Sequence, residues 1–272
     1  MKARTLRTRE RYGRWALVAG GSEGLGASFA RALAGEGHDL LLVAERAEPL
    51  ESFAQEISRE FSVRAEAIVC DLSDRGALDD LIVRTQSLEL GVLVCNAAYV
   101  PFGPFVETSR EDKLRALAVN CEAPLLLVDA IAPKMASRNK GAIVIVSSMA
   151  GRQGSALFAT YAATKAFDLV LAESLWDELR AHGIDVVGVC AGATRTPGWE
   201  RSGAEPPWYA PPVTEPDLVA REALGALGER PSLVAGVINR AATFAMERLL
   251  PRKLAIEVLG NSTRRVFRKR IA

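Results

Sequence analysis

Short apolar runs alternate with longer stretches of helical periodicity along most of the chain. Several runs are rich in valine and isoleucine and contain no polar position, which is typical of strands buried on both faces of a parallel sheet. Right-handed crossover helices between such strands give an α/β fold, a single doubly wound parallel sheet with helices on both faces. The predicted strands span residues 15–19, 40–44, 65–70, 92–95, 142–147, 184–190 and 232–235.

Turn signals and the lack of a linker define the organisation of the chain. Gly37, Gly141 and Gly183 each follow a helical stretch, where we expect the left-handed conformation that ends many helices. We predict one domain over residues 1–238 and a basic, amphipathic helical extension over residues 239–272. Residues 191–215 form the one long irregular stretch, and their aromatic side chains predict a lid.

Composition places the chain among ordinary folded proteins, with 49% hydrophobic and 25% charged residues. No apolar run approaches the roughly 20 residues that span a bilayer, and no signal peptide precedes the first strand, so we expect a cytoplasmic protein. Cys70, Cys95, Cys121 and Cys190 lack the paired spacing of a metal site. We therefore expect buried free thiols and no metal.

The formal net charge of +1 hides two basic ends, residues 1–14 and 240–272, around a middle that is acidic on balance. Such ends can bind nucleic acid or an anionic membrane, although a solvated surface is the commoner outcome. We expect no nucleic acid partner. Two interpretations of the C-terminal extension stay open, peripheral contact with a membrane and docking of a helix on its own domain or on a neighbouring subunit.

A glycine-rich turn follows the first predicted strand and precedes an alanine-rich helix. Its sequence is Ala-Gly-Gly-Ser-Glu-Gly-Leu-Gly over residues 19–26. Glycines let the backbone approach a diphosphate closely, while the helix N-terminus supplies free N–H groups and a favourable dipole. The pattern predicts a dinucleotide site, with cofactor-binding candidates Gly20, Ser22, Glu23, Gly24, Leu25 and Gly26.

Residues at the end of the second predicted strand bear on whether the bound dinucleotide is NAD or NADP. Glu45 stands nineteen residues beyond Gly26, where a carboxylate can accept hydrogen bonds from ribose hydroxyls and would repel a 2′-phosphate. Glu23 adds a second negative charge, so the sequence favours NAD. Arg46 could instead pair with a phosphate, which leaves NADP open.

Chemistry-bearing residues follow the fifth predicted strand. Tyr161 and Lys165 are four residues apart, a spacing that puts both side chains on one face of a helix. A free tyrosine has a pKa of about 10, and a nearby cation favours the phenolate, so Tyr161 is a candidate acid/base. Ser148 lies thirteen residues earlier, at a strand end, where its hydroxyl can bind a substrate oxygen.

These residues, together with Asn96-Ala97-Ala98 and Asn120, resemble the short-chain dehydrogenase/reductase family over residues 15 to about 236. The resemblance implies a Rossmann-type catalytic domain in which Tyr161 exchanges a proton with the carbonyl or alcohol oxygen while Ser148 holds that oxygen. It also implies that Lys165 binds the nicotinamide ribose and lowers the tyrosine pKa. Asn120 would position a water molecule in the proton relay.

Further cofactor contacts are implied by the same resemblance. Tyr161 and Lys165 would themselves contact the cofactor, Asp71 and Leu72 would touch the adenine, and the Asn96 segment would steady the strands beside the cofactor. The family usually ends its sixth strand in Pro-Gly, whereas this chain has Ala191-Gly192, with Thr196 where the family threonine binds the carboxamide. The implied additional contacts are Asn96, Ala97, Ala98, Gly192, Thr194 and Thr196.

Aromatic and apolar residues cluster around these motifs and predict an apolar substrate pocket. A bulky, hydrophobic alcohol or ketone, steroid-like or lipid-like, suits such a pocket better than a sugar. The candidate substrate residues are Tyr99, Met149, Phe158, Trp199 and Trp208.

Two other functions are considered beside the dehydrogenase. One is a non-catalytic NAD-binding sensor or scaffold, and the other is a membrane-associated binding module that uses the basic C-terminal segment. The resemblance also implies a homodimer or homotetramer.

Overall fold

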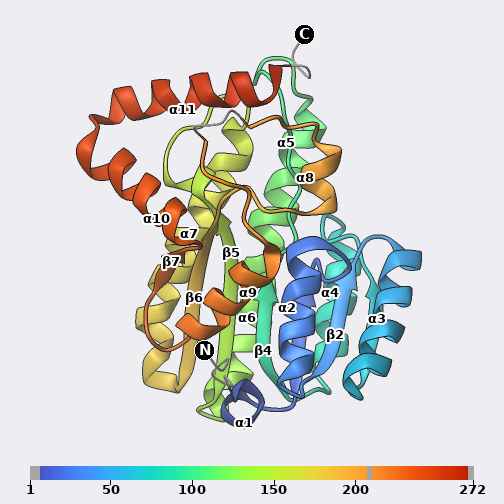
Figure 1. The fold of residues 1–272 in the computed structure, drawn as a ribbon. Coiled ribbons are helices and arrows are strands. Elements are labelled where there is room, and N and C mark those ends of the chain that lie inside the picture. Colours follow the sequence, from blue (N-terminus) through green and yellow to red (C-terminus); the bar gives the residue numbers. More distant parts are fainter. Residues whose placement is uncertain (1–6, 207–209, 269–272) are drawn as a thin grey trace.

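The computed structural model describes residues 7–206 and 210–268. Within this part of the chain, seven strands form one sheet in the order β3-β2-β1-β4-β5-β6-β7, and neighbouring strands run parallel (Figure 1). The predicted fold is confirmed, and strand ends differ from the prediction by at most two residues. The strands are β1 (Trp15–Ala19), β2 (Asp39–Ala44), β3 (Ala65–Val69), β4 (Leu90–Cys95), β5 (Gly141–Ser148), β6 (Ile184–Ala191) and β7 (Ser232–Val234).

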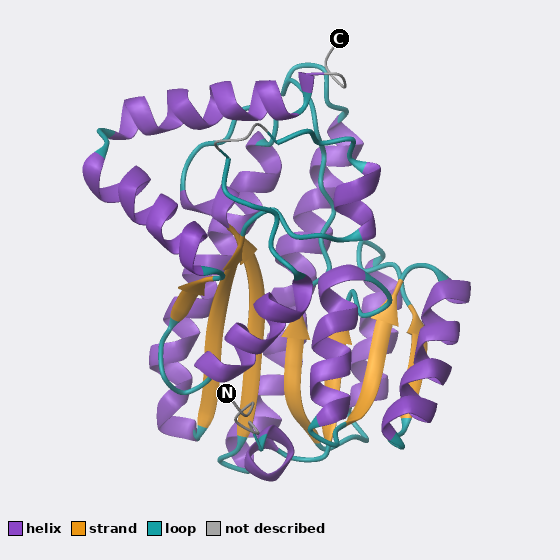
Figure 2. Ribbon diagram, viewed as in Figure 1, coloured by secondary structure: helices purple, strands orange, loops and turns teal. Residues whose placement is uncertain are grey.

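Helices cover both faces of the sheet (Figure 2). The main helices of the domain are α1 (Thr8–Tyr12), α2 (Gly24–Gly35), α3 (Ala47–Phe61), α4 (Arg75–Thr85), α5 (Arg110–Leu117), α6 (Ala123–Ser137), α7 (Ala159–Leu179), α8 (Pro197–Arg201) and α9 (Pro216–Ala226). Because successive strand residues point to opposite faces, Val18 and Val144 pack with α2, α3 and α9. Leu17 and Ile143 pack with α4, α6 and α7 on the other face.

The strand order reverses direction at the junction of β1 and β4. From β1 the chain builds outward through β2 and β3, and it then returns to place β4 on the other side of β1. In sheets of this kind, ligands bind beyond the carboxyl ends of the strands at such a reversal. The loops after β1, β2, β3 and β4 therefore surround the expected ligand crevice.

Two of the three predicted helix caps have the expected conformation. Gly37 (φ 85°) and Gly183 (φ 66°) are left-handed. Gly141 is not, because it is already the first residue of β5, and Asn139 (φ 51°) makes the left-handed turn two residues earlier. Asparagine tolerates this conformation better than most residues with a side chain, so the helix ended sooner than the glycine suggested.

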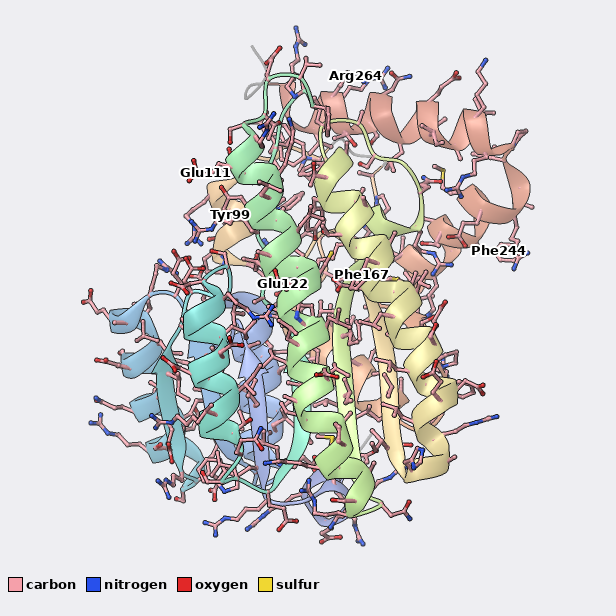
Figure 3. The ribbon with its side chains drawn as sticks, turned by 180° about the vertical axis from the view of Figure 1, so that it is seen from behind. Tyr99, Glu111, Glu122, Phe167, Phe244 and Arg264 are labelled. Carbon is pink, nitrogen blue, oxygen red and sulfur yellow. The ribbon has the colours of Figure 1, made fainter. Side chains whose placement is uncertain are left out.

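The helical run Arg110–Ser137 combines α5, the π-helical turn η1 (Ala118–Glu122) and α6, and lies beside α7 (Figure 3). By length and composition alone it could cross a membrane, but half of its most apolar window is buried inside the protein. Leu127 and Ile131 pack against the sheet. A core helix passes the same test of length and composition, and the packing of this run fits that interpretation.

The predicted C-terminal extension begins inside α10 (Val237–Phe244) and continues through the π-helical turn η4 (Ala245–Leu249) to α11 (Arg252–Val266), which crosses above the carboxyl ends of the strands (Figure 1). A two-pronged ion pair between Arg152, in the 3₁₀ turn η2 (Met149–Arg152), and Glu247 ties η4 to the domain. Ala255 and Gly260 are buried, the latter near Ala156. The extension therefore docks on its own domain. The remaining 3₁₀ turn is η3 (Arg180–His182).

Cysteine placement follows the prediction at three of four positions. Cys70, Cys95 and Cys190 are buried free thiols, whereas Cys121 is only half-buried.

Candidate active site

The glycine turn after β1 adopts a shape that side chains would block. Gly20 is left-handed (φ 79°), and a Cβ there would stand 2.7 Å from the Ala97 Cα. A Cβ on Gly26 would lie 1.8 Å from the Gly20 carbonyl oxygen, because α2 begins directly against the turn. The Asn96 side chain donates from Nδ2 to that same carbonyl at 2.9 Å. These contacts join the first and fourth strand ends and leave the N-terminus of α2 facing the crevice.

A cleft of about 360 Å³ lies over this turn. Most of the predicted cofactor residues line it, namely Gly20, Ser22, Glu23, Gly24, Leu25, Glu45, Arg46, Asp71, Leu72, Asn96, Ala97, Ala98 and Thr196. Gly26, Tyr161, Lys165, Gly192 and Thr194 are not among its lining residues. The lining also includes residues that the motifs did not indicate, among them Arg115, Val119 and Pro197.

Charged side chains at the cleft are paired with one another. Glu23 binds Arg201 at 2.6 Å and Arg46 at 2.7 Å. The two guanidinium groups hold the pKa of Glu23 below its usual range, although partial burial opposes them. Glu23 therefore does not present the unopposed negative charge that the sequence suggested, and Arg46 is already engaged by a carboxylate.

Glu45 is paired as well, with a residue distant in sequence. Arg115 of α5 donates to Glu45 at 2.8 Å and to Asp71 at 3.1 Å, and its guanidinium stacks on the Tyr99 ring at 5.1 Å. Electrostatic repulsion of a 2′-phosphate by Glu45 is thereby weakened, because a cation stands beside the carboxylate. This end of the cleft therefore combines a carboxylate with a guanidinium group.

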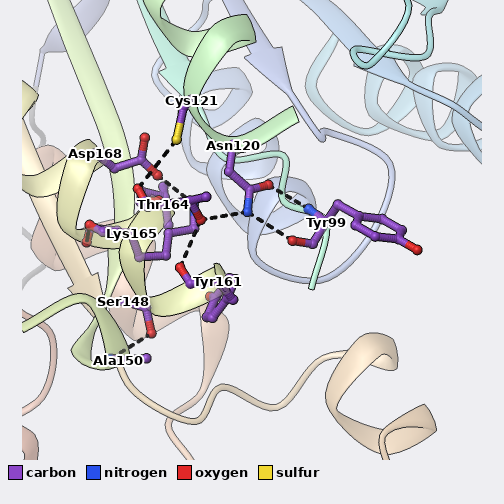
Figure 4. Close-up of polar contacts among 11 residues, drawn as sticks. Tyr99, Asn120, Cys121, Ser148, Ala150, Tyr161, Thr164, Lys165 and Asp168 are labelled. Atoms are coloured by element: carbon purple, nitrogen blue, oxygen red, sulfur yellow. Dashed lines mark hydrogen bonds and ion pairs between the residues drawn. The ribbon is translucent and has the colours of Figure 1, made fainter. Parts of the chain in front are cut away.

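The predicted acid/base residues come from β5 and the first turns of α7 (Figure 4). Ser148 is the last residue of β5, and its Oγ accepts a hydrogen bond from the Ala150 N–H at 3.2 Å. Tyr161 lies in the first turn of α7 and is partly exposed, with its ring beside that of Phe158. The strand end and the helix start thus carry the hydroxyl and the phenol on elements that contact each other.

Lys165 is buried. Its Nζ donates to the Val146 carbonyl and to Asp168 Oδ2, each at 2.8 Å, and the residue is 3% exposed. Burial is the largest single effect and disfavours its charge, but Asp168, with smaller contributions from Tyr161 and Cys121, outweighs burial and places the pKa of Lys165 above its usual value. The sequence did not single out Asp168, although an acid three residues after the lysine on one helix face is a recognisable pair.

Asn120 occupies η1, the π-helical turn between α5 and α6, and is buried. Its amide accepts from the Tyr99 N–H at 2.7 Å, and donates to the Tyr99 carbonyl and to Thr164 Oγ1, both at 2.9 Å. Thr164 Oγ1 in turn donates to the Tyr161 carbonyl at 2.8 Å. Asn120 therefore links the loop after β4 to the start of α7, and π-helical turns recur at functional sites.

The loop after β6, which lacks the proline of the family pattern, packs closely against other segments. A Cβ on Gly192 would lie 2.7 Å from the Asn239 amide and 3.1 Å from the Met149 sulfur. Thr194 Oγ1 donates to the Gly192 carbonyl at 3.0 Å, and Thr194 forms a bridge with Thr214. Thr196 caps α8, and a Cβ on Gly24 would lie 2.9 Å from its methyl group.

Four rings from four separate segments gather beside Tyr161, and we call Phe102, Phe158, Trp199 and Phe267 the aromatic wall. Phe267, at the end of α11, lies 4.8 Å from Phe102, 5.4 Å from Phe158 and 6.5 Å from Trp199 between ring centroids. Phe102 and Phe158 are 5.1 Å apart, and Phe158 is 6.1 Å from Tyr161. The wall therefore reaches the candidate proton donor directly.

The predicted substrate residues divide between different surroundings. Phe158 and Trp199 belong to the aromatic wall. Tyr99 does not, because its hydroxyl donates to Asp112 and its ring lines the cofactor cleft, turned away from Tyr161 (Figure 4). Met149 packs beside the buried cluster of β6, β7 and α7. Trp208 lies outside the described residues.

Sequence reasoning missed Phe267 and Arg115 as site residues. Phe267 belongs to the amphipathic pattern of the extension, and nothing local indicated that α11 returns to the wall. Arg115 lies seventy residues from Glu45 along the chain. Both become neighbours of the site only through tertiary packing.

Comparison with known proteins agrees with the fold. A family model described as short chain dehydrogenase matches residues 14–206. A 7β-hydroxysteroid dehydrogenase of Clostridium sardiniense is 30% identical over 232 residues, which make up 85% of this chain and 89% of that enzyme. A solved structure from a study of 7β-hydroxysteroid dehydrogenase stereoselectivity has a TM-score of 0.86 at 28% identity, covering 93% of this chain and 99% of its own. A short-chain dehydrogenase of Sphingobium yanoikuyae in complex with NADPH has a TM-score of 0.76 at 33% identity, covering 87% and 94%.

Proposed function

We propose that this chain, which belongs to the short chain dehydrogenase family of oxidoreductases, transfers a hydride between a nicotinamide dinucleotide and a bulky, hydrophobic secondary alcohol or ketone. The observation that carries the proposal is the aromatic wall, which continues from Phe267 through Phe158 to the Tyr161 ring. Aromatic side chains supply large apolar contact areas at fixed positions. A substrate with a steroid-like or lipid-like skeleton would bury that skeleton against the wall and present its oxygen to Tyr161.

Each polar residue has a proposed part in the reaction. The nicotinamide, when bound, supplies or accepts the hydride. In reduction, Tyr161 donates its phenolic proton to the carbonyl oxygen, and Ser148 Oγ donates a hydrogen bond to the same oxygen. In oxidation, the phenolate of Tyr161 takes the proton of the alcohol. Lys165 supplies the positive charge that favours the phenolate, and Asn120 holds the start of α7 through Thr164.

The residues at the cleft fit a dinucleotide. The glycine turn brings backbone N–H groups of α2 to the position of a diphosphate. At the adenosine end, Glu45 favours a ribose hydroxyl, whereas Arg46 and Arg115 offer cations to a 2′-phosphate. We therefore propose that the preference for NAD is small and that NADP is also bound, in keeping with the NADPH complex of the Sphingobium relative.

Exposed apolar residues on α5 and α7, including Leu114, Leu117, Phe167 and Val170, support assembly into a homodimer or homotetramer through this helical face (Figure 3). We propose a cytoplasmic protein. Docking of α11 on its own domain favours that interpretation of the extension over a membrane anchor, and nothing at the site favours a non-catalytic sensor.

A panel of substrates tests the proposal. Hydroxysteroids, bulky aryl ketones and small alcohols are assayed by absorbance at 340 nm with NAD(H) and NADP(H) in both directions. We expect kcat/KM to rise with the apolar bulk of the substrate. Turnover of small or sugar alcohols in preference to every bulky compound would contradict the proposed substrate class, while the family assignment would stand.

A further inference from the structure

Lys165 and Asp168 form an ion pair in the interior of the protein, one turn apart on α7 (Figure 4). The Nζ to Oδ2 distance is 2.8 Å, and the two side chains are 3% and 2% exposed. Nζ also donates to the Val146 carbonyl of β5. Removing two charges from water is unfavourable unless their attraction and further hydrogen bonds compensate for the lost hydration.

The compensation for Asp168 is incomplete. Its Oδ1 is buried and has no hydrogen-bond partner within the part of the chain that the structure describes. The same helix buries Leu169 and Ala172 against the sheet, so an apolar residue would suit position 168 at lower cost. A buried polar atom without a partner calls for a reason other than packing.

Three other titratable side chains lie near the pair. Lys165 faces Tyr161 on its own helix and Cys121 on η1, and Cys95 at the end of β4 lies close enough to interact with both members of the pair. Burial raises the pKa of Cys121 to about 11 and also raises that of Cys95, so both stay thiols at neutral pH. The adjoining strand β5 contributes the Val146 carbonyl and the Ser147 hydroxyl. Among the described residues, Asp168 is the carboxylate that forms an ion pair with Lys165.

We propose that Asp168 is a positioning residue that keeps Lys165 protonated and holds its Nζ at the Val146 carbonyl, and thereby sets the pH range in which Tyr161 exchanges its proton. Without an anion, full burial disfavours the ammonium and can lower a lysine pKa by about 3 to 5 units. A neutral lysine no longer favours the phenolate of Tyr161. The inference rests on the part proposed above for Tyr161 as the acid/base.

The test is the pH dependence of alcohol oxidation by Asp168→Asn, which removes the charge and keeps the size and one oxygen acceptor. Oxidation requires deprotonated Tyr161, so activity rises with pH through the tyrosine pKa. We expect the acidic limb of the kcat profile to move to higher pH by about 1 unit or more. An acidic limb that stays in place would overturn the proposal. A limb displaced to lower pH would also overturn it, because it would mean that Lys165 stays protonated without Asp168 and that Asp168 only offsets the effect of the ammonium on Tyr161.

Asp177→Asn is the matched control. Asp177 lies on the same helix and pairs with Arg180, but its side chain is 67% exposed. We expect its pH profile to coincide with that of the unchanged protein. A shift equal to that of Asp168→Asn would assign the effect to overall charge and overturn the proposal.

A second measurement decides the outcome if Asp168→Asn is inactive or if no substrate has been found. Thermal unfolding is compared for Lys165→Met, Asp168→Leu and the double variant. Each single change leaves one buried charge alone, so we expect each to lower the melting temperature and the double variant to regain much of that loss. Additive losses would show that the two side chains do not act as a pair. This result does not depend on the proposed substrate, so failure of the proposed function is distinguishable from failure of the inference.

Discussion

Truncation of Phe267 tests whether the C-terminal extension builds part of the substrate site. The ring is 7% exposed and contacts three other rings of the aromatic wall. Each aromatic pair contributes about 0.5 to 1.5 kcal/mol beyond the area that it buries. The three pairs therefore contribute about 1.5 to 4.5 kcal/mol to the packing of Phe267 in the aromatic wall. Loss of one wall contact of about 1.4 kcal/mol with the substrate corresponds to a tenfold change in kcat/KM.

The assay compares one bulky ketone with one small ketone on Phe267→Ala and Phe244→Ala. Phe244 is a matched control because it lies on the same extension but is 61% exposed. We expect Phe267→Ala to lower kcat/KM for the bulky ketone about tenfold and to change the value for the small ketone little. Equal losses for both ketones, or the same loss in Phe244→Ala, would refute the assignment of Phe267 to the substrate wall.

Three further predictions concern the proton donor, the cofactor and acid stability. Tyr161→Phe should abolish turnover and leave NADH binding, followed by fluorescence titration, nearly unchanged; loss of both would mean that the phenol is structural. Glu45→Ala should raise the ratio of kcat/KM for NADP to that for NAD, because it removes a negative charge beside the ribose. Arg115→Ala should lower the same ratio, because it removes a cation. A ratio that stays constant in both variants would exclude this pair as the determinant of cofactor preference. Burial lowers the pKa of His38 from 6.5 to about 4, so the unfolded chain binds the proton more readily. The free energy of unfolding should therefore fall as pH decreases from 6.5 toward 4, by up to about 3 kcal/mol, and this fall should shrink in His38→Gln but persist in the exposed control His182→Gln.

The sequence predicted the parts of the fold that local periodicity governs. Buried parallel strands read as continuous apolar runs, and their ends matched the structure within two residues. The cap at Gly141 was wrong because Asn139 adopted the left-handed turn first. Such errors arise where two neighbouring residues can both satisfy the same backbone requirement.

The sequence also indicated chemistry that depends on short spacing or on motif order. The glycine turn lines the cleft with Glu45 and Asp71, and Ser148 and Tyr161 arise from adjacent elements. These positions follow from parallel topology, because loops at the carboxyl ends of neighbouring strands meet at one edge of the sheet.

Tertiary structure alone decided which side chains meet across long separations. Arg115 neutralises Glu45 from α5, Phe267 returns from the last described helix to complete the aromatic wall, and Tyr99 turns toward Asp112 instead of the substrate region. Such contacts depend on how helices dock on the sheet and on the competition among partners for each charge or ring. Amphipathic periodicity shows that a helix face is buried, and only packing determines what that face is buried against.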